Sequence, residues 1–344
     1  MSDKVTINTI AEQCNVSPTT VSLVLNHKPG ASNETRARVL ETARKLGYKV
    51  SANTNGKSRR LSTVGIIVKT EPDLLPPSNP FYSQIIAGVD DACSDLGINL
   101  LFSMLPVDKD NHPTKIPPLI DQNSLSGLLL VGTFIDQTIF SLFGNNIPPI
   151  ILVDGYSDTG SYDMVLSDNF GAAYQAVEYL IKLGHRNIGL IGSEPGCYPS
   201  INERRSGYLR ALKDYDIADN FLANFNINRS QGEKETIHLL QENPQITALF
   251  CVNDNVALGA MRGAQQLNRT IPNDLSIIGY DDTFLATSIS PALTTMRVDT
   301  LVMGRAAIHL LALRIEKPDA ARLTLTIHPT LIERESTIPT LNTL

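Results

Sequence analysis

The sequence predicts an all-α helix-turn-helix head followed by an α/β body with two lobes. Three short amphipathic helical patterns with capping residues occupy the first fifty residues. From residue 63 onward, short apolar runs alternate with amphipathic stretches in two similar series, which predicts parallel sheets with right-handed crossovers. The charge divides in the same way. Residues 1–60 contain ten Lys and Arg against four Asp and Glu, a net charge of +6. The whole chain has a net charge of −6, so residues 61–344 have a net charge of −12. A basic head on an acidic body indicates that the head meets a polyanion.

The composition is that of a globular protein, with 344 residues, 42% hydrophobic and 19% charged. The longest apolar run, GLLLVGTFI at 127–135, is too short to cross a bilayer, and the first residues have no signal-peptide pattern. The four cysteines are dispersed, which argues against a disulfide framework or a zinc site. We therefore expect a cytoplasmic protein without a metal, a cofactor or a membrane partner.

Each helix of the head has a recognisable beginning. Thr6 can cap a first helix, and Ser17 can cap a second in which Pro18 takes the first helical position. Ser32 can cap a third helix, and its predicted inner face is Val39, Leu40, Ala43 and Leu46. Two short helices joined by a tight turn form a helix-turn-helix.

The outward face of the second helix is the predicted reading surface. In a helix-turn-helix this helix enters the major groove, so Thr19, Ser22 and Leu23 would contact bases or phosphates. A leucine there can pack on a thymine methyl group. It can equally be a single exposed leucine with no role in recognition, and the sequence leaves both interpretations open.

The segment VTINTIAEQCNVSPTTVSLVLN, followed by SNETRARVLETARKLGY, resembles the DNA-binding head of the LacI/GalR bacterial repressors. GHRNIGLIG, VNDNVALGAM, IPNDLSIIGYDDT and PTLIERES resemble later blocks of that family in the same order. The resemblance covers nearly the whole chain. It implies a transcriptional regulator, a repressor, with a periplasmic-binding-protein-like body that binds a small polar effector between its lobes. The family usually has an arginine where this chain has Leu23, so an operator sequence does not transfer.

The resemblance also implies the domain organisation. A helix-turn-helix domain is expected at 1–50, a hinge at 51–62 and the effector-binding body at 63–340. The first lobe would contain about 63–164 and 294–324, and the second about 165–293 and 325–340. One helix-turn-helix covers a half-site, so we expect a homodimer on a palindromic double-stranded operator. The expected DNA-contacting residues are Thr6, Ser17, Pro18, Thr19, Ser22, Leu23, Asn26, Ser32, Thr35, Lys57, Arg59 and Arg60.

The hinge departs from the family pattern. Ser51 stands where an asparagine is usual, and NTNGK at 53–57 replaces the helix-forming part. A glycine alone costs about 1 kcal/mol in a helix. Lys57, Arg59 and Arg60 suit phosphates or a narrow minor groove. We therefore expect a coil-like electrostatic hinge without a leucine wedge, Leu61 being the one candidate wedge; the alternative is a hinge helix that forms on DNA.

Polar residues at strand ends predict a ligand site, because ligands bind beyond the carboxyl ends of parallel strands. Asp154, Asn253 and Asp281 each end an apolar run, and Arg204 opens a helix after another. Each acidic residue taken alone is better explained as a helix cap, but together with Arg204 they favour a site. Phe81 and Tyr82 open a predicted helix of the first lobe and are further candidates, as aromatic rings for stacking on a flat ligand face.

Carboxylates and a guanidinium around aromatic rings suit a polyhydroxylated ligand. A sugar is the first interpretation, and a nucleobase or nucleoside is the second. An enzyme is the alternative class, but GxSxG, HExxH, P-loop and GxGxxG motifs are absent and the six histidines are dispersed, so no catalytic residues are expected. A sugar-binding protein that does not bind DNA would not need the basic head.

Overall fold

The computed structural model describes residues 6–25, 30–46, 61–70, 79–108, 112–121, 125–135, 148–157, 160–195, 197–225 and 229–340. The chain divides into two compact units, Met1–Ser58 and Arg59–Leu344, called below the head and the body. None of the helices in the described ranges combines the length and hydrophobicity that a membrane crossing requires.

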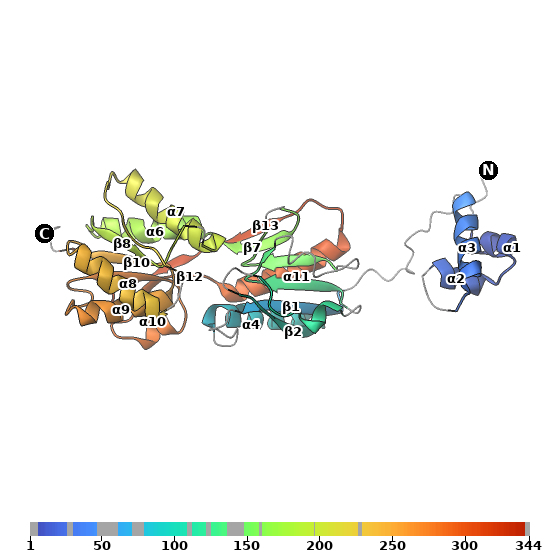
Figure 1. The fold of residues 1–344 in the computed structure, drawn as a ribbon, viewed down its shortest axis with the longest axis horizontal. Helices are drawn as coiled ribbons and strands as arrows, with labels where there is room; N and C mark the ends of the chain where they lie inside the picture. Colours follow the sequence, from blue (N-terminus) through green and yellow to red (C-terminus); the bar gives the residue numbers. More distant parts are fainter. Residues whose placement is uncertain are drawn as a thin grey trace. The chain divides into compact units, whose positions relative to one another are not determined.

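The head contains α1 (Ile7–Cys14), α2 (Pro18–Leu25) and α3 (Asn33–Lys45), as predicted (Figure 1). Asn15 ends α1 in the left-handed conformation with φ 50°, which lets α2 begin three residues later. The three inner faces form one small core, made of Ile10, Ala11, Cys14, Val21, Val24, Leu25, Val39 and Ala43. The prediction for Leu40 was wrong: its side chain is 39% exposed, because Val39 and Ala43 already fill the narrow inner face of α3.

The first lobe is built on a six-stranded parallel sheet in the order β13-β7-β5-β3-β1-β2. Its strands are β1 (Thr63–Thr70), β2 (Asn99–Pro106), β3 (Gly127–Val131), β5 (Ile150–Val153), β7 (Asp163–Ser167) and β13 (Thr324–Ile327). A short 3₁₀ helix, η2 (Pro118–Asp121), and a two-stranded pair, β4 (Phe134–Ile135) with β6 (Tyr156–Ser157), complete the lobe.

Helices α4 (Pro80–Leu96) and α11 (Thr300–Glu316) pack against one another in the first lobe. Their backbones nearly touch, because a Cβ on Gly88 would lie 2.2 Å from the carbonyl oxygen of Leu301. A Cβ on Gly304 would lie 2.3 Å from the carbonyl oxygen of Ile85. The two glycines therefore permit a crossing that no larger residue allows.

The second lobe has a six-stranded sheet in the order β14-β12-β11-β10-β8-β9, with β14 antiparallel. The strands are β8 (Ile188–Ile191), β9 (Phe221–Ala223), β10 (Ala248–Cys251), β11 (Ser276–Asp281), β12 (Thr294–Arg297) and β14 (Thr330–Ile332). In Figure 1, α6 (Asn169–Lys182) and α7 (Pro199–Asp214) lie on one side of this sheet. On the other side lie α8 (Arg229–Glu242) and α9 (Asp254–Gln266), with the short α10 (Leu285–Ser288) beside α9.

The chain passes between the lobes three times: after β7, between β12 and α11, and between β13 and β14. The predicted lobe boundaries follow residues 164, 293 and 324. They fall three or four residues before the ends of β7, β12 and β13, where the chain leaves each lobe. The reason is the same in each case, because each of these strands completes hydrogen bonding in its sheet before the chain leaves the lobe. One hydrophobic core cluster extends through both lobes.

Candidate functional site

A cluster of polar side chains from both lobes lies where the lobes meet. Asp154 follows β5 and Tyr82 lies in the first turn of α4, with the Tyr82 hydroxyl 3.5 Å from Asp154 Oδ2. From the second lobe, Arg204 of α7 places Nη1 3.4 Å from Oδ1 of Asp281, the last residue of β11. Four of the six predicted effector-binding residues thus belong to one group, called below the polar cluster.

Arg204 is the centre of the polar cluster. Its side chain is buried, and its Nε donates to Asn169 Oδ1 at 2.9 Å while Nη1 donates to the carbonyl oxygen of Val252 at 2.6 Å. The guanidinium carbon lies 3.7 Å from the centroid of the Tyr280 ring, a cation–π arrangement. These contacts hold the fork in one orientation, so its remaining hydrogen-bonding capacity is directed at Asp281.

Direct hydrogen bonds join the lobes around this centre. Tyr198, just before α7, donates to the carbonyl oxygen of Asp154 at 3.0 Å. Tyr156 of the first lobe donates to Glu203 Oε2 at 3.0 Å. The Lys69 ammonium lies 4.5 Å from the centroid of the Tyr198 ring. The lobes are therefore closed onto one another by side chains of the chain itself.

Burial disfavours the charged forms of the carboxyl groups here. It raises the pKa of Asp154 to about 6, although Arg204 and Lys69 oppose the shift. Burial also raises the pKa of Asp281 to about 8 against the opposing charge of Arg204, and the neighbouring Asp254 and Asp154 add to the rise. Asp154 and Asp281 have φ values of 47° and 102°, so the backbone turns sharply at both strand ends. Asp154 of the first lobe is thereby directed at the second lobe, and Asp281 of the second lobe at the first.

The remaining two predicted residues do not place their side chains in the polar cluster. Asn253 caps α9, its Oδ1 accepting from the amide of Val256 at 2.8 Å. Phe81 is only 9% exposed and belongs to the hydrophobic core, edge-on to Tyr82 at 5.6 Å. A stacking role for Phe81 stays a prediction, and this conformation does not present its ring.

Sequence reasoning missed several members of the polar cluster. Asn169 follows β7, and Tyr156 lies two residues after Asp154, so the strand-end rule that found Asp154 could have found both. Asn169 Nδ2 donates to Glu203 Oε2 at 3.2 Å and so connects Glu203 to Arg204. Glu203 itself had no signal apart from its position next to Arg204.

In the head, three of the predicted DNA-contacting residues, Thr6, Ser17 and Ser32, cap the helices. Ser17 Oγ accepts from the amide of Thr20 at 3.0 Å, and Ser32 Oγ accepts from the amide of Thr35 at 3.2 Å. Thr6 and Thr9 form a reciprocal capping box. Each cap fixes a helix N-terminus, whose amides and dipole favour phosphate. The caps are confirmed, and contact of these residues with DNA stays a prediction.

On the outward face of α2, Pro18 and Thr19 are exposed while Ser22 and Leu23 are half-buried. Leu23 Cδ1 lies 3.3 Å from the position that a Cβ on Gly30 would take, and Gly30 has φ +122°. Leu23 therefore covers the turn at Gly30 with part of its side chain. This contact explains a leucine at this position without DNA, and the exposed remainder is what a thymine methyl could touch.

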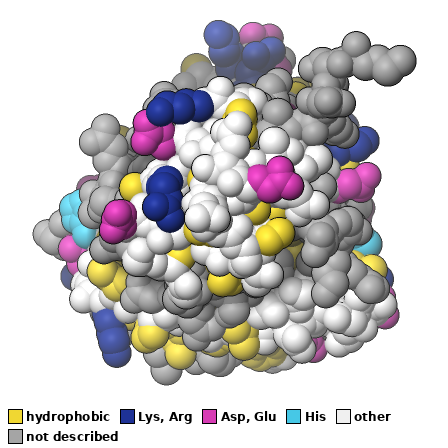
Figure 2. All heavy atoms as spheres, turned by 90° about the vertical axis from the view of Figure 1, so that its right-hand side faces the viewer, with side chains coloured by type: hydrophobic (Ala, Val, Ile, Leu, Met, Phe, Trp, Pro, Cys, Tyr) yellow, Lys and Arg dark blue, Asp and Glu magenta, His cyan; other side chains and the backbone are white. Residues whose placement is uncertain are grey.

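Asn26, Lys57, Arg59 and Arg60, together with the predicted hinge up to Arg60, lie outside the described residues. Leu61 is described, and it packs against the core of the body. On the face drawn in Figure 2, Lys and Arg side chains are separated by Asp, Glu and uncharged groups, so the described residues of this face form no continuous basic patch.

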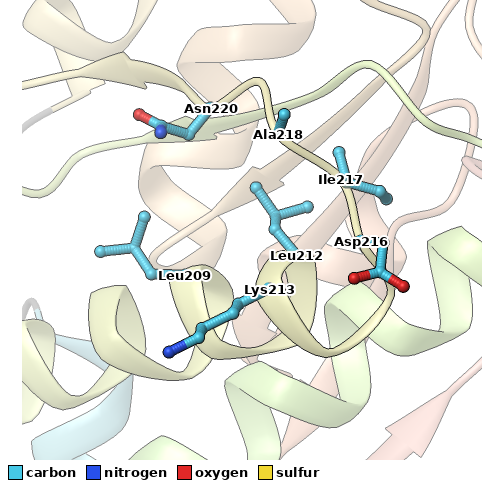
Figure 3. A pocket seen from close by; sticks show the side chains of 7 residues that line it. All are labelled: Leu209, Leu212, Lys213, Asp216, Ile217, Ala218 and Asn220. Atoms are coloured by element: carbon cyan, nitrogen blue, oxygen red, sulfur yellow. The ribbon is translucent and has the colours of Figure 1, made fainter.

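A separate hollow of about 420 Å³ lies beside the C-terminal half of α7 (Figure 3). Its lining consists of Leu209, Leu212, Lys213, Asp216, Ile217, Ala218 and Asn220, all from α7 and the segment leading to β9. No residue of the polar cluster lines it, so it is not the predicted effector site.

Residues 6–51 match the model of the bacterial regulatory proteins of the lacI family, and residues 177–337 match that of the periplasmic binding protein-like domain. Catabolite control protein A of Priestia megaterium is 30% identical over 316 residues, covering 91% of this chain and 93% of the relative. The ribose operon repressor of Haemophilus influenzae is 31% identical over 335 residues, covering 96% and 98%. The chain belongs to the lacI family.

Other lacI-family similarities extend over the same length. The transcriptional repressor PurR of Aliivibrio salmonicida is 29% identical, covering 96% of this chain and 98% of the relative. Among solved structures, the transcriptional regulator CelR in complex with cellobiose has a TM-score of 0.71 at 27% identity, covering 97% of this chain and 100% of that one. The expected fold class is confirmed, and the chain is a transcriptional repressor of the lacI family; PurR and the ribose operon repressor are repressors by name.

Proposed function

We propose that this lacI-family repressor binds a palindromic operator as a homodimer and that a small polar effector, a sugar, bound at the polar cluster controls its affinity for DNA. The observation that carries the proposal is the group of Asp154, Arg204 and Asp281, in which Asp154 and Arg204 are buried and Arg204 pairs with Asp281. Each lobe contributes to it, so a ligand there contacts both lobes at once.

The bonds across the lobes explain how a ligand would act on the rest of the chain. An effector between the lobes replaces the contacts of Tyr198 with Asp154 and of Tyr156 with Glu203. It thereby favours the lobe arrangement that fits it best, and a ligand shifts an equilibrium only by its unequal affinity for the two states. The same free energy couples to DNA binding if the operator prefers one of these arrangements.

A sugar is the first choice because carboxylates accept hydroxyl protons and a guanidinium donates in a fork. Two relatives support the choice by name, the ribose operon repressor and the regulator in complex with cellobiose. A nucleobase is the second candidate. It is favoured by the edge-to-face pair of Tyr156 and Tyr198, whose ring centroids are 5.7 Å apart at the cluster.

A homodimer needs a self-complementary apolar face, and the edge strand β2 of the first lobe offers one. Phe102 and Met104 are 44% and 40% exposed, and their two-residue spacing puts both on the same face of the sheet. We propose a second copy of the chain as the occupant, since a single head covers a half-site. Phe102→Glu should shift the chain to monomer in sedimentation and weaken operator binding.

The test joins ligand binding to DNA binding. The full chain is screened for thermal stabilisation by neutral sugars and nucleobases, and footprinting then measures operator affinity with and without the stabilising compound. We expect one compound class to raise the unfolding midpoint and to change operator affinity at least fivefold. A ligand that stabilises the chain and leaves DNA binding unchanged contradicts the proposal, as does a footprint without two-fold symmetry.

A further inference from the structure

We propose that Tyr198 is a latch: it closes the two lobes on one another through side chains of the chain itself, and the lobes separate only when its contact with the first lobe breaks. The latch follows from contacts within the chain. Its effect on DNA rests on the proposed function, since only an operator that distinguishes the two lobe arrangements responds to it.

Tyr198 occupies the N-cap position of α7 without acting as a cap. Its side chain makes no capping hydrogen bond, and Pro199 follows at the first helical position. Ser, Thr, Asp and Asn are the residues that stabilise a helix from this position. The tyrosine is therefore not explained by the helix that it precedes, and its side chain has a different partner.

The hydroxyl of Tyr198 donates to the first lobe. It reaches the carbonyl oxygen of Asp154, directly after β5, at 3.0 Å. Asp154 is buried and has a left-handed φ of 47°, so the regular strand ends here and the carbonyl needs a donor from elsewhere. If the lobes closed without this hydroxyl, the carbonyl would lose its donor and the closed arrangement would be less stable.

Two residues of the first lobe hold the ring of Tyr198. The Lys69 ammonium, from β1, lies 4.5 Å from the ring centroid. The ring of Tyr156, from β6, meets it edge to face with the centroids 5.7 Å apart. A cation over the face and an aromatic edge both favour one orientation of the ring, and this orientation directs the hydroxyl at Asp154.

Tyr156 closes the junction in the opposite direction. Its hydroxyl, on the first lobe, donates to Glu203 Oε2 on α7 at 3.0 Å. Burial raises the pKa of Tyr156, so its phenol stays protonated and remains a donor. Glu203 Oε2 also accepts from Asn169 Nδ2 at 3.2 Å, which fixes the carboxylate. The two tyrosines thus form reciprocal hydrogen bonds across the junction, and loss of either should favour separated lobes.

Cys197, next to Tyr198, provides a reporter of this separation within the chain. It is half-buried, whereas Cys14, Cys93 and Cys251 are buried. Its side chain packs against the hydrophobic cluster that extends through both lobes, and burial raises the pKa of its thiol. Because the thiolate is the reactive form, alkylation should be slow in the closed arrangement, and its rate should follow the fraction of open molecules.

The test measures alkylation of Cys197 by N-ethylmaleimide in the full chain, resolved by peptide mass spectrometry. Tyr198→Phe and Tyr156→Phe each remove one hydroxyl and keep the ring. Tyr215→Phe is the matched control, because Tyr215 follows α7 and donates to Glu178 within the second lobe. We expect alkylation to be about fivefold faster in each of the first two variants, as the loss of one hydrogen bond implies, and unchanged in the control.

Equal rates in Tyr198→Phe and the control overturn the inference. Acceleration in Tyr198→Phe without acceleration in Tyr156→Phe also overturns it, because Tyr198 would then hold only its own segment and not the lobes. Operator affinity of the same variants, measured without effector, tests the step to DNA. Faster alkylation in both variants with unchanged operator affinity supports the latch and contradicts the proposed function alone.

Discussion

The head and the polar cluster satisfy their polar groups over different distances along the chain. In the head, Thr6 with Thr9, Ser17 with Thr20 and Ser32 with Thr35 are pairs three residues apart. In the polar cluster, Arg204 reaches Asn169 across 35 residues and Val252 across 48, and Tyr82 reaches Asp154 across 72.

The difference shows at which positions a substitution should destabilise only one helix and at which it should destabilise both lobes. A local cap stabilises one helix end, so its loss is confined to that helix. A buried long-range contact joins elements that fold separately, so its loss reaches both lobes. The head should therefore tolerate single polar substitutions that the polar cluster does not.

Arg204→Ala should have the largest effect. It leaves Asp281 without its cation and Asp154 with Lys69 alone, which should lower the unfolding free energy of the body by about 3 kcal/mol. Urea unfolding followed by far-UV circular dichroism measures it, since the chain has no tryptophan. Arg205→Ala on the same helix is the control, and equal losses in both variants would contradict a special role for Arg204.

Gly30→Ala should come next, and its effect should be confined to the head. The left-handed φ of +122° and the nearby Leu23 methyl group together should cost the head about 2 kcal/mol. Hydrogen exchange of the α2 amides measures it. Gly160→Ala is the control, because Gly160 also has a positive φ but has no neighbour within 4 Å of the added Cβ. Slower exchange in α2 after Gly30→Ala would show that the turn is not strained.

Ser17→Ala should cost the head about 1 kcal/mol, because α2 loses its cap. Ser17→Asp should restore that stability, since aspartate caps as well as serine, and yet weaken operator binding through repulsion of phosphate. Head stability and operator affinity are therefore measured together on both variants. If Ser17→Asp binds DNA as wild type does, the N-terminus of α2 does not approach the phosphate backbone.

Leu61→Ala should have the smallest effect, below about 1 kcal/mol, and only on the body, because its side chain is only partly buried against the body core. Bending of the operator in circular permutation gels should be unchanged. Bending that disappears in this variant would show that Leu61 leaves the body and acts as a wedge in the minor groove.

The same contrast explains what the sequence could predict. The caps at Thr6, Ser17 and Ser32 depend on the next three residues, so the sequence contains all the information needed. The strand-end rule found Asp154 and Asp281 because the ends of parallel strands meet at one sheet edge.

The rest depends on how separate elements face one another. Tyr198 and Glu203 became members of the polar cluster only through partners 44 and 47 residues away in the other lobe. Phe81 precedes Ile85 and Val89 by four and eight residues, so helical spacing places its ring on the buried face of α4, and the prediction did not use that spacing for Phe81. The prediction that Leu40 lies on the inner face of α3 failed because the narrow width of that face leaves the Leu40 side chain exposed.

The close crossing of α4 and α11 has a consequence for synthesis of the chain. α4 begins at Pro80, but α11, against which it packs closely, ends only at Glu316. The first lobe therefore cannot complete this helix pair until almost the whole chain has left the ribosome. The head has all three helices by residue 45. During translation the head can thus fold while the body is still incomplete, and a truncated nascent chain carries a formed head without the site that would regulate it.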